Sequence, residues 1–213
     1  MPRRIECGDA LPWLRAHADC GAVVTSLPDA DEIGASMGDW AAWFREAAAA
    51  CARGASPGAP AIFYQTDRKA GGGLHSKALL VMEAASAAGS RLLWHKIVLA
   101  RAPGLVDIRR PGYSHLIAVS RSGKPGKASP DVIGNPGQRA YANGLGLNVA
   151  IFACRFAALS ARRIVDPFCG RGTIPATAEA LGLEAIGIDI DPAQCDHARR
   201  LKVEITDGRG IES

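Results

Sequence analysis

The segment Asp166-Pro-Phe-Cys-Gly-Arg-Gly-Thr173 decides the fold. It follows an apolar run, Arg163–Asp166, that predicts a strand, and it continues into a predicted helix at 173–181. Gly170 and Gly172 lack a Cβ and would let a ligand approach the backbone, while the amide groups at the start of the helix would face an anionic group. Because ligands of open α/β sheets bind at the carboxyl ends of strands, the segment predicts a nucleotide-like cofactor site.

The next predicted strand, Glu184–Asp189, supplies the second half of this site. The Asp189 carboxylate would accept hydrogen bonds from both hydroxyls of a ribose, and Ile190 would offer an adenine ring an apolar face. A nicotinamide dinucleotide fingerprint also pairs a glycine turn with a later acid, but it has a third glycine where this chain has Pro175. A strand, turn and helix without a ligand is the other alternative.

Strands and helices alternate along almost all of the remaining chain. Short apolar runs predict strands at 4–7, 21–25, 61–65, 91–100 and 114–120, and longer amphipathic or alanine-rich runs predict helices at 38–53, 76–88, 143–159 and 192–203. This alternation predicts an α/β fold with a mostly parallel sheet and helices on both faces, in one domain spanning 1–213.

The order of the elements carries a further prediction. Only one helix and a short tail follow the strand that ends at Asp189, whereas the other strands all precede the glycine turn. This order predicts a circularly permuted domain. Its catalytic half would be 1–120, followed by a flexible basic loop at 121–142 and a cofactor-binding half at 143–213.

Composition narrows the function classes. The 213 residues are 48% hydrophobic and 22% charged, which is typical of a globular chain. No apolar run approaches the roughly 20 residues that span a membrane, so we expect no membrane partner. The six cysteines show no zinc-binding spacing, so we expect reduced thiols, no metal site and a cytoplasmic location. The net charge of +4 is compatible with a nucleic-acid partner.

The segment 166–173, together with Gly187-Ile-Asp189-Ile-Asp-Pro192, resembles motif I and its acidic partner in the amino-methyltransferases of DNA and RNA. The whole chain is similar to the circularly permuted β-class of these enzymes. The resemblance implies a single Rossmann-like domain with a seven-stranded sheet, and S-adenosyl-L-methionine as the cofactor. The segment Cys7-Gly8-Asp9-Ala10-Leu11 resembles the Gly-Asp-Ala-Leu segment that reaches the adenine in this family. The cofactor-binding residues expected on this basis are Gly8, Asp9, Ala10, Thr25, Asp166, Pro167, Phe168, Cys169, Gly170, Gly172, Thr173, Asp189 and Ile190.

The expected catalytic residues are Ser26, Leu27, Pro28 and Asp29. They lie where the family carries Ser-Pro-Pro-Tyr, a loop in which a side-chain oxygen and a backbone carbonyl bind the target amino group and the aromatic ring stacks on the flipped base. Here the stacking ring is absent from the loop, unless Trp40, Trp43, Tyr64 or Tyr113 supplies it. Asp29 would either accept a proton or hydrogen bond from the target or cap the following segment.

Three outcomes stay open for the reaction. The protein methylates a base amino group, methylates another nucleophile such as a ribose hydroxyl or ring nitrogen, or binds the cofactor without turnover as the partner of another methyltransferase.

Two basic loops are the expected contacts with a polymer substrate. They lie at 101–113 and 121–139, and the candidate residues are Arg109, Arg110, Tyr113, Lys124, Lys127 and Arg139. Basic side chains with an aromatic residue suit a phosphate backbone, although a pair of solvated loops is the simpler alternative. No segment is left over for a separate target-recognition region, so we expect tRNA or rRNA in preference to DNA. The helix with Trp40 and Trp43 would pack internally or form a homodimer face.

Overall fold

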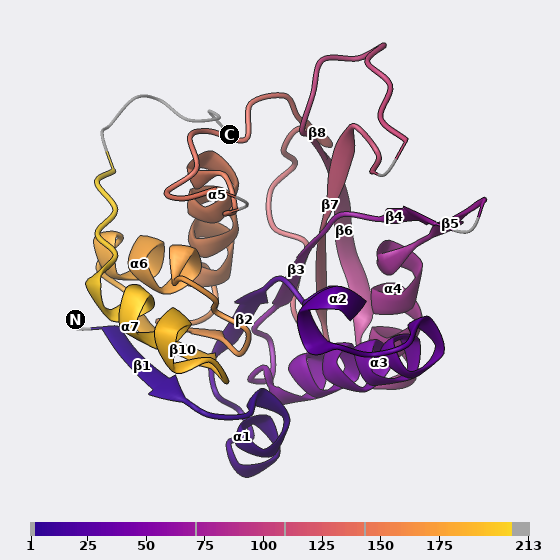
Figure 1. Ribbon diagram of the computed structural model, residues 1–213. Helices are drawn as coiled ribbons and strands as arrows, with labels where there is room; N and C mark the ends of the chain where they lie inside the picture. The colour runs from indigo at the N-terminus through magenta and orange to yellow at the C-terminus, as the bar shows by residue number, and fades with distance from the viewer. Residues whose placement is uncertain (1–2, 71, 109, 143, 206–213) are drawn as a thin grey trace.

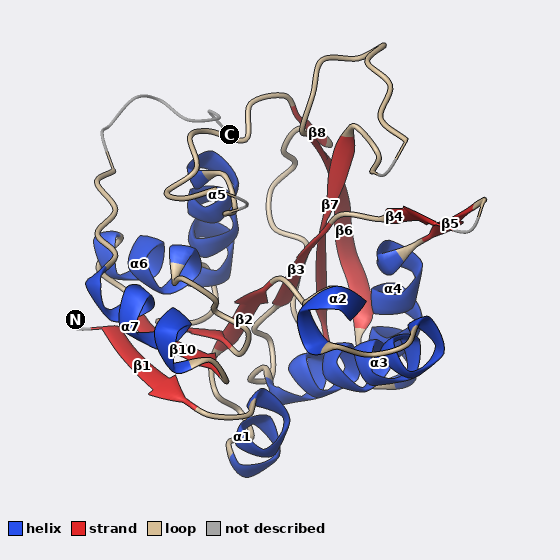
Figure 2. Ribbon diagram, viewed as in Figure 1, coloured by secondary structure: helices blue, strands red, loops and turns tan. Residues whose placement is uncertain are grey.

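The computed structural model describes residues 3–70, 72–108, 110–142 and 144–205, and Figure 1 shows their arrangement. A long twisted sheet runs through the molecule, with helices on both of its faces (Figure 2). The strands are β1 (Arg3–Cys7), β2 (Ala22–Thr25), β3 (Ala61–Gln65), β4 (Arg68–Ala70), β5 (Gly73–His75), β6 (Arg91–Leu99), β7 (Tyr113–Ser120), β8 (Val132–Ile133), β9 (Arg163–Asp166) and β10 (Glu184–Asp189). The helices are α1 (Ala10–Ala16), α2 (Ala30–Ile33), α3 (Met37–Gly54), α4 (Lys77–Ala87), α5 (Leu147–Ala158), α6 (Thr173–Ala180) and α7 (Pro192–Arg200).

The main sheet has the strand order β1-β10-β9-β2-β3-β7-β6-β8. The two last strands of the chain, β9 and β10, therefore lie between its two first strands, β1 and β2. All neighbouring pairs are parallel except β3 with β7 and β6 with β7, which are antiparallel. The α/β fold with a mostly parallel sheet is thus confirmed.

The number of strands differs from the predicted seven, because the sheet has eight. The additional strand is β8, which pairs in parallel with β6 inside the segment 121–142 that was predicted to be a flexible loop. Ile133 is buried there, and the ammonium group of the buried Lys96 donates to the carbonyls of Ser129 (3.1 Å) and Pro130 (2.9 Å). A short apolar pair and one buried lysine therefore hold this segment against the sheet edge.

The two faces of the sheet carry separate cores. Consecutive residues of a strand point to opposite faces, and in β3 Phe63 packs with the helices α3 and α4 while Ile62 packs on the side of α5 and α6. Ile117 and Leu116 of β7 divide in the same way. In the described part of the chain, none of the helices is long and apolar enough to cross a membrane.

The loops that hold most of the predicted site residues leave the sheet at one end, where the parallel strands finish; this end is called the carboxyl edge below. The strands β1, β10, β9, β2 and β3 are parallel, and β6 runs in the same direction because both β3 and β6 are antiparallel to β7. The carboxyl ends of these strands therefore lie at one edge. The turn after β9, the loop after β2, the β4–β5 hairpin after β3 and the loop after β6 all leave the sheet there.

Candidate cofactor and catalytic site

The turn after β9 is tied to the end of β2. The Thr25 hydroxyl donates to Asp166 Oδ1 at 2.6 Å, and the Phe168 amide donates to the same oxygen at 3.2 Å. Both Thr25 and Asp166 are buried. Burial raises the pKa of Asp166 to about 7, although the hydrogen bond from Thr25 opposes the shift. The predicted cofactor turn after β9 and the predicted catalytic loop, residues 26–29 after β2, therefore meet at this carboxyl group.

Asp189 at the end of β10 organises the turn from the other side. One carboxylate oxygen accepts from the Gly170 amide at 2.8 Å and the other from the Asp191 amide at 2.9 Å, while the Asp189 carbonyl accepts from the Gly8 amide at 2.9 Å. Asp189 is half-buried, and the neighbouring Ile190 is 72% exposed. The acidic group and the apolar side chain that were predicted to meet ribose and adenine lie side by side and are accessible.

The start of α6 fits an anionic ligand. Gly172, its N-cap, has φ +89°, and a Cβ at this position would lie 2.8 Å from the Cβ of Ala198 in α7. Thr173 is buried, and its hydroxyl lies near the Tyr141 phenol without forming a well-aligned hydrogen bond to a described residue. A carboxylate at the helix N-terminus would accept from this hydroxyl and from the free amides of the first turn.

Other residues predicted to contact the cofactor have structural roles in this arrangement. Asp9 caps α1 by accepting from the Leu11 amide at 2.9 Å, and Ala10 is buried in the first turn of that helix. Pro167 and Cys169 are buried in the turn, where the Cys169 amide donates to the Ile188 carbonyl. Phe168 packs edge-on against Trp43, with ring centroids 5.7 Å apart.

The loop after β2 divides its predicted catalytic residues between surface and core. Ser26 is exposed at the carboxyl end of β2, directly after Thr25. Leu27 is 2% exposed and belongs to the core on the α3 side, so only its backbone can face a substrate. The Pro28 carbonyl accepts from the indole of the buried Trp40 at 3.0 Å.

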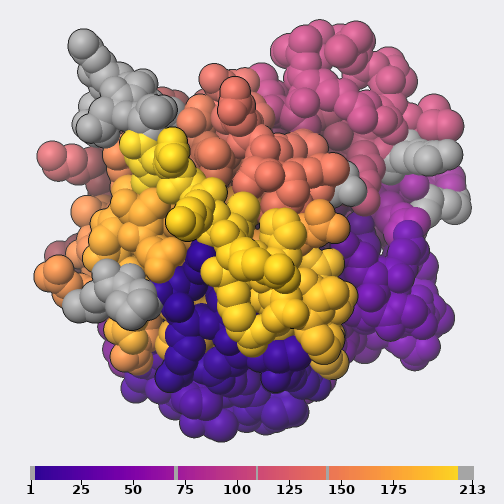
Figure 3. Space-filling view, turned by 60° about the vertical axis from the view of Figure 1, so that its left-hand side comes forward, coloured from indigo at the N-terminus to yellow at the C-terminus, as the bar shows by residue number. Residues whose placement is uncertain are grey.

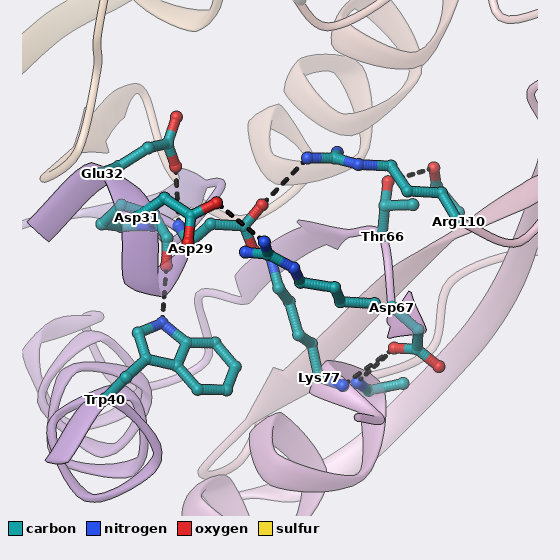
Figure 4. Close-up of polar contacts among 12 residues, drawn as sticks. Asp29, Asp31, Glu32, Trp40, Thr66, Asp67, Lys77 and Arg110 are labelled. Carbon is teal, nitrogen blue, oxygen red and sulfur yellow. Dashed lines mark hydrogen bonds and ion pairs between the residues drawn. The ribbon is translucent and has the colours of Figure 1, made fainter. Parts of the chain in front are cut away.

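Asp29 caps the short helix α2, and its carboxylate lies between two cations (Figure 4). Its Oδ1 contacts the ammonium group of Lys77, which is buried at the start of α4. Its Oδ2 accepts from the exposed guanidinium of Arg110 at 3.1 Å. The predicted capping role is therefore present, and the carboxylate is engaged in ion pairs on both oxygens.

Lys77 and the polar residues behind it carried no sequence signal that marked them as part of the site. Asp67, buried after β3, accepts from the amides of Lys77 (2.8 Å) and Ala78 (3.3 Å) at the start of α4. Its other oxygen contacts His115 Nε2 at 3.2 Å, and His115 Nδ1 lies 2.8 Å from His95 Nε2. Burial lowers the pKa of His95. This network positions the helix that presents Lys77 to Asp29.

The predicted substrate contacts separate into two groups. Arg110 forms an ion pair with Asp29 of the predicted catalytic loop. Arg139 precedes α5 and forms an antiparallel β-bridge with Gly146 at the start of that helix. Lys124 and Lys127 are exposed, but the structure does not bring them to this edge. Their segment begins at the opposite edge, where Arg121 donates to the Ala55 carbonyl and Arg91 at the start of β6 donates to the Gly123 carbonyl. Arg109 lies outside the described residues.

The four aromatic side chains considered as stacking partners are engaged elsewhere. Trp40 is buried, Trp43 packs on Phe168, and Tyr64 packs in the core on the α5 side. Tyr113 meets His115 edge-on at 5.3 Å between ring centroids. A ring that sequence reasoning missed, Tyr141, lies 5.5 Å from the guanidinium of Arg171 in the cofactor turn, and burial raises its pKa.

Solved structures of methylases share this architecture along nearly the whole chain. A protein of Thermus thermophilus, provisionally assigned as a DNA modification methylase and solved with S-adenosyl-L-methionine, matches with a TM-score of 0.72 and 18% identity over 97% of this chain and 98% of that chain. The PvuII DNA methyltransferase, which is cytosine-N4-specific, matches with a TM-score of 0.76 and 14% identity over 97% and 89%. The chain has the fold of these proteins. The M1.HpyAVI–SAM complex is similar as well, with a TM-score of 0.66 and 14% identity over 92% and 98%. No protein-family model matches the sequence, and no curated protein matches it.

Proposed function

We propose that the protein is an S-adenosyl-L-methionine-dependent methyltransferase that methylates an amino group of a base in DNA. The observation that carries the proposal is the contact by which Thr25, the last residue of β2 before the predicted catalytic residues, donates to Asp166 of the cofactor turn at 2.6 Å. Ser26, the next residue, thereby lies beside the place where the resemblance puts the methyl donor.

The residues at the turn fit the proposed cofactor. The hydroxyl of Thr173 and the amides of Thr173 and Ile174 would hold its carboxylate, and Asp189 with Ile190 would hold the adenosine. The α-ammonium group of the cofactor would favour the ionised form of Asp166, whose pKa burial has raised. When bound, the cofactor would supply an electrophilic methyl group.

The side chains of the catalytic loop would orient the acceptor. The Ser26 hydroxyl and the Leu27 carbonyl would accept hydrogen bonds from the target amino group and aim its lone pair at the methyl group. Asp29 is held by Lys77 and Arg110, so we assign it to the loop's structure and not to proton abstraction. The proton that the nitrogen loses after transfer would then pass to water.

The strand order supports the proposal that this domain is circularly permuted, as in the β-class. The cofactor strands β9 and β10 end the chain but lie between β1 and β2, and β2 carries the catalytic loop. Joining the two ends of this chain and opening it before α5 would give an order that starts with the cofactor-binding half.

DNA is the better-supported substrate, whereas the sequence alone favoured RNA. Of the similar solved proteins described above, one is provisionally assigned as a DNA modification methylase and another is a cytosine-N4-specific DNA methyltransferase. The expectation of RNA rested on the lack of a spare segment for target recognition, but a neighbour provisionally assigned as a DNA modification methylase is matched over 98% of its chain. Methylation at cytosine N4 or adenine N6 fits the amino-group chemistry of the loop.

Cofactor binding followed by methyl transfer tests the proposal. We expect calorimetry to detect binding of S-adenosyl-L-methionine, and labelled cofactor to transfer its methyl group to unmethylated plasmid DNA. Mass spectrometry of the nucleosides should then find N4-methylcytosine or N6-methyladenine. Transfer to total tRNA or rRNA instead would move the proposal to RNA, and binding without transfer to any pool would make the protein a non-catalytic partner.

Two variants test the cofactor turn and the catalytic loop separately in this experiment. Asp189→Ala should weaken cofactor binding by more than tenfold, or about 1.4 kcal/mol, while the exposed Asp196→Ala of α7 serves as its control. Ser26→Ala should keep the cofactor affinity and lower methyl transfer by more than tenfold, because the target amino group loses an acceptor. Ser122→Ala, an exposed serine at the opposite edge, is the matched control.

A further inference from the structure

We infer that the tip of the loop between β6 and β7, formed by Leu105, Val106 and Ile108, is a wedge that enters duplex DNA where the target base leaves the stack. The inference rests on the proposed function. Leu105 is 65% exposed, Val106 88% and Ile108 84%. Single exposed aliphatic side chains are ordinary on a protein surface, but three within four consecutive residues form an apolar tip that calls for a partner.

The loop holds this tip in a defined position. At its base the amides of Ala100 and Arg101 donate to the Gly112 carbonyl at 2.9 and 3.2 Å. Closer to the tip, Asp107 accepts from the Arg110 amide at 3.0 Å and forms an ion pair with Arg101. In Figure 1 the loop stands clear of the sheet, and in the space-filling view of Figure 3 its pink atoms project at the upper right. The apolar side chains are therefore displayed on a braced loop.

The tip lies close to the catalytic loop. Arg110 reaches Asp29 at 3.1 Å, and Val106 is four residues before it in the chain. At about 3.3–3.6 Å per residue, Val106 is at most about 14 Å from Arg110 along the backbone. The loop also leaves the sheet at the carboxyl edge, the same edge as Ser26 and the cofactor turn.

Charge around the tip matches a nucleic acid. The sequence of the loop at 101–112 has three arginines and one aspartate, for a net charge of +2. The hairpin at 68–75 adds Lys69 and Arg68, of which Arg68 forms an ion pair with Asp31 at 2.8 Å. Lys69 joins the two elements, because its ammonium group donates to the Asp107 carbonyl at 2.9 Å. An apolar tip with a basic surround is the arrangement that unstacks base steps while binding phosphates.

The chemistry of the catalytic loop gives the wedge a purpose. An enzyme that modifies a base within a duplex has to extrude it and offset the lost stacking. Asp29 stands where the related loops carry the stacking ring, so this chain holds the extruded base less well inside the site. Side chains that fill the gap in the duplex would stabilise the same extruded state from the other side.

A second copy of the chain fits the tip less well. Three aliphatic side chains offer at most about 350 Å² of apolar surface, whereas a stable dimer buries about 800 Å² on each partner. The small size and the basic surround both favour a narrow, anionic partner.

The test compares intact and heat-denatured linear plasmid DNA as substrates of the full chain. The double variant Val106→Ser/Ile108→Ser should lower methyl transfer to the duplex by more than tenfold and change transfer to denatured DNA by less than twofold, because single strands need no extrusion. Val106→Ile/Ile108→Val, which keeps the tip apolar, should retain duplex activity. Leu159→Ser, at a 74% exposed position at the end of α5, is the control for loss of an exposed aliphatic side chain. Cofactor affinity should be unchanged in all three variants.

The possible outcomes separate this inference from the proposed function. Equal losses on both substrates, no loss on either, or a wild-type protein that methylates only denatured DNA would overturn the wedge and leave the methyltransferase standing. Sedimentation that shows a wild-type dimer and a monomeric double variant would make the tip a self-association surface and would also overturn it. No methyl transfer to either form of DNA would overturn the proposed function and the wedge with it.

Discussion

In the cofactor turn, backbone groups make most of the contacts, whereas in the catalytic loop ion pairs between distant side chains make them. The turn is held by amides of Phe168, Gly170 and Asp191 that donate to two carboxylates. The loop depends on Asp29, whose carboxylate is held by Lys77 from α4 and Arg110 from the loop after β6. The turn therefore depends on the backbone path that Gly170 and Gly172 allow, whereas the loop depends on side chains from distant elements.

The same contrast separates what each region can vary. The turn permits few alternatives at Gly172, because its φ is positive and a Cβ there would overlap with Ala198 of α7. In the loop, the Asp29 carboxylate depends on contact with the buried Lys77. Substitutions in the two regions should therefore differ in size and in kind.

The largest effect is expected at Gly172. Gly172→Ala would place a Cβ 2.8 Å from the Cβ and 2.9 Å from the Cα of Ala198, in a residue with φ +89°. We expect a loss of about 4 kcal/mol in the free energy of unfolding and no measurable cofactor binding, because strain and overlap add. Chemical denaturation and calorimetry with S-adenosyl-L-methionine provide the measurements.

Gly182→Ala is the matched control for the backbone strain. Gly182 has φ +74°, and a Cβ there would meet nothing within 4 Å. We expect a loss of about 1 kcal/mol from strain alone and an unchanged cofactor affinity. Equal losses at both positions would show that the packing of α6 against α7 does not constrain the turn.

Sequence patterns predicted the features that depend on local chemistry. The apolar runs identified all the longer strands, and the spacing of Gly170, Gly172 and Asp189 identified the turn that the structure forms. Helix α5 begins at Leu147, later than the predicted 143, because Gly146 is its N-cap. Gly144 and Gly146 in the sequence could have indicated this later start, but the predicted helix included both of them.

Contacts between distant segments could not be predicted in this way. Arg110 and Asp29 are 81 residues apart, and a basic residue in a loop is equally consistent with solvent or phosphate. In the sequence, Lys77 is an ordinary residue at the start of an alanine-rich helix. Only the tertiary structure shows that it is buried beside Asp29. Strand β8 failed for a related reason, since two residues are too few to show a period.

The second prediction tests the ion pairs directly. Lys77→Met keeps the length and the apolar stem of the side chain but removes the charge that faces the half-buried Asp29. Removing Lys77 from this buried pair leaves the Asp29 carboxylate with the exposed Arg110 as its remaining ion-pair partner among the described residues, so we expect the free energy of unfolding to fall by about 3 kcal/mol. Urea denaturation at pH 7 measures the change.

Arg110→Ala is the companion variant at the exposed end of the same carboxylate. Arg110 is 56% exposed in its side chain, against 5% for Lys77. Exposed ion pairs contribute about 0.5 kcal/mol, so stability should hardly change. If Arg110→Ala cost as much as Lys77→Met, the loop would depend on both cations equally, and the distinction between a buried brace and a surface contact would fail.

Of the three main substitutions, the smallest effect is expected at Asp166, where the free energy of unfolding should change with pH. Its pKa is about 7 in the folded protein, against an ordinary value of 3.8, because burial disfavours the charged form. Folding therefore takes up a proton between these values, and wild-type stability falls as pH rises toward 7 and levels off above it. Asp166→Asn keeps an oxygen that can accept from Thr25 and Phe168 but has no charge to bury. We expect the variant to gain about 2–3 kcal/mol relative to the wild type between pH 5 and pH 8 in the absence of cofactor, because each pKa unit corresponds to about 1.4 kcal/mol. Saturating S-adenosyl-L-methionine should make the wild type more stable than Asp166→Asn at pH 8, because its ammonium group would interact with the carboxylate and not with the amide. A difference that is flat with pH would mean that Asp166 is ionised throughout, and the cofactor turn would then hold a charge by side-chain pairing in the same way as the catalytic loop.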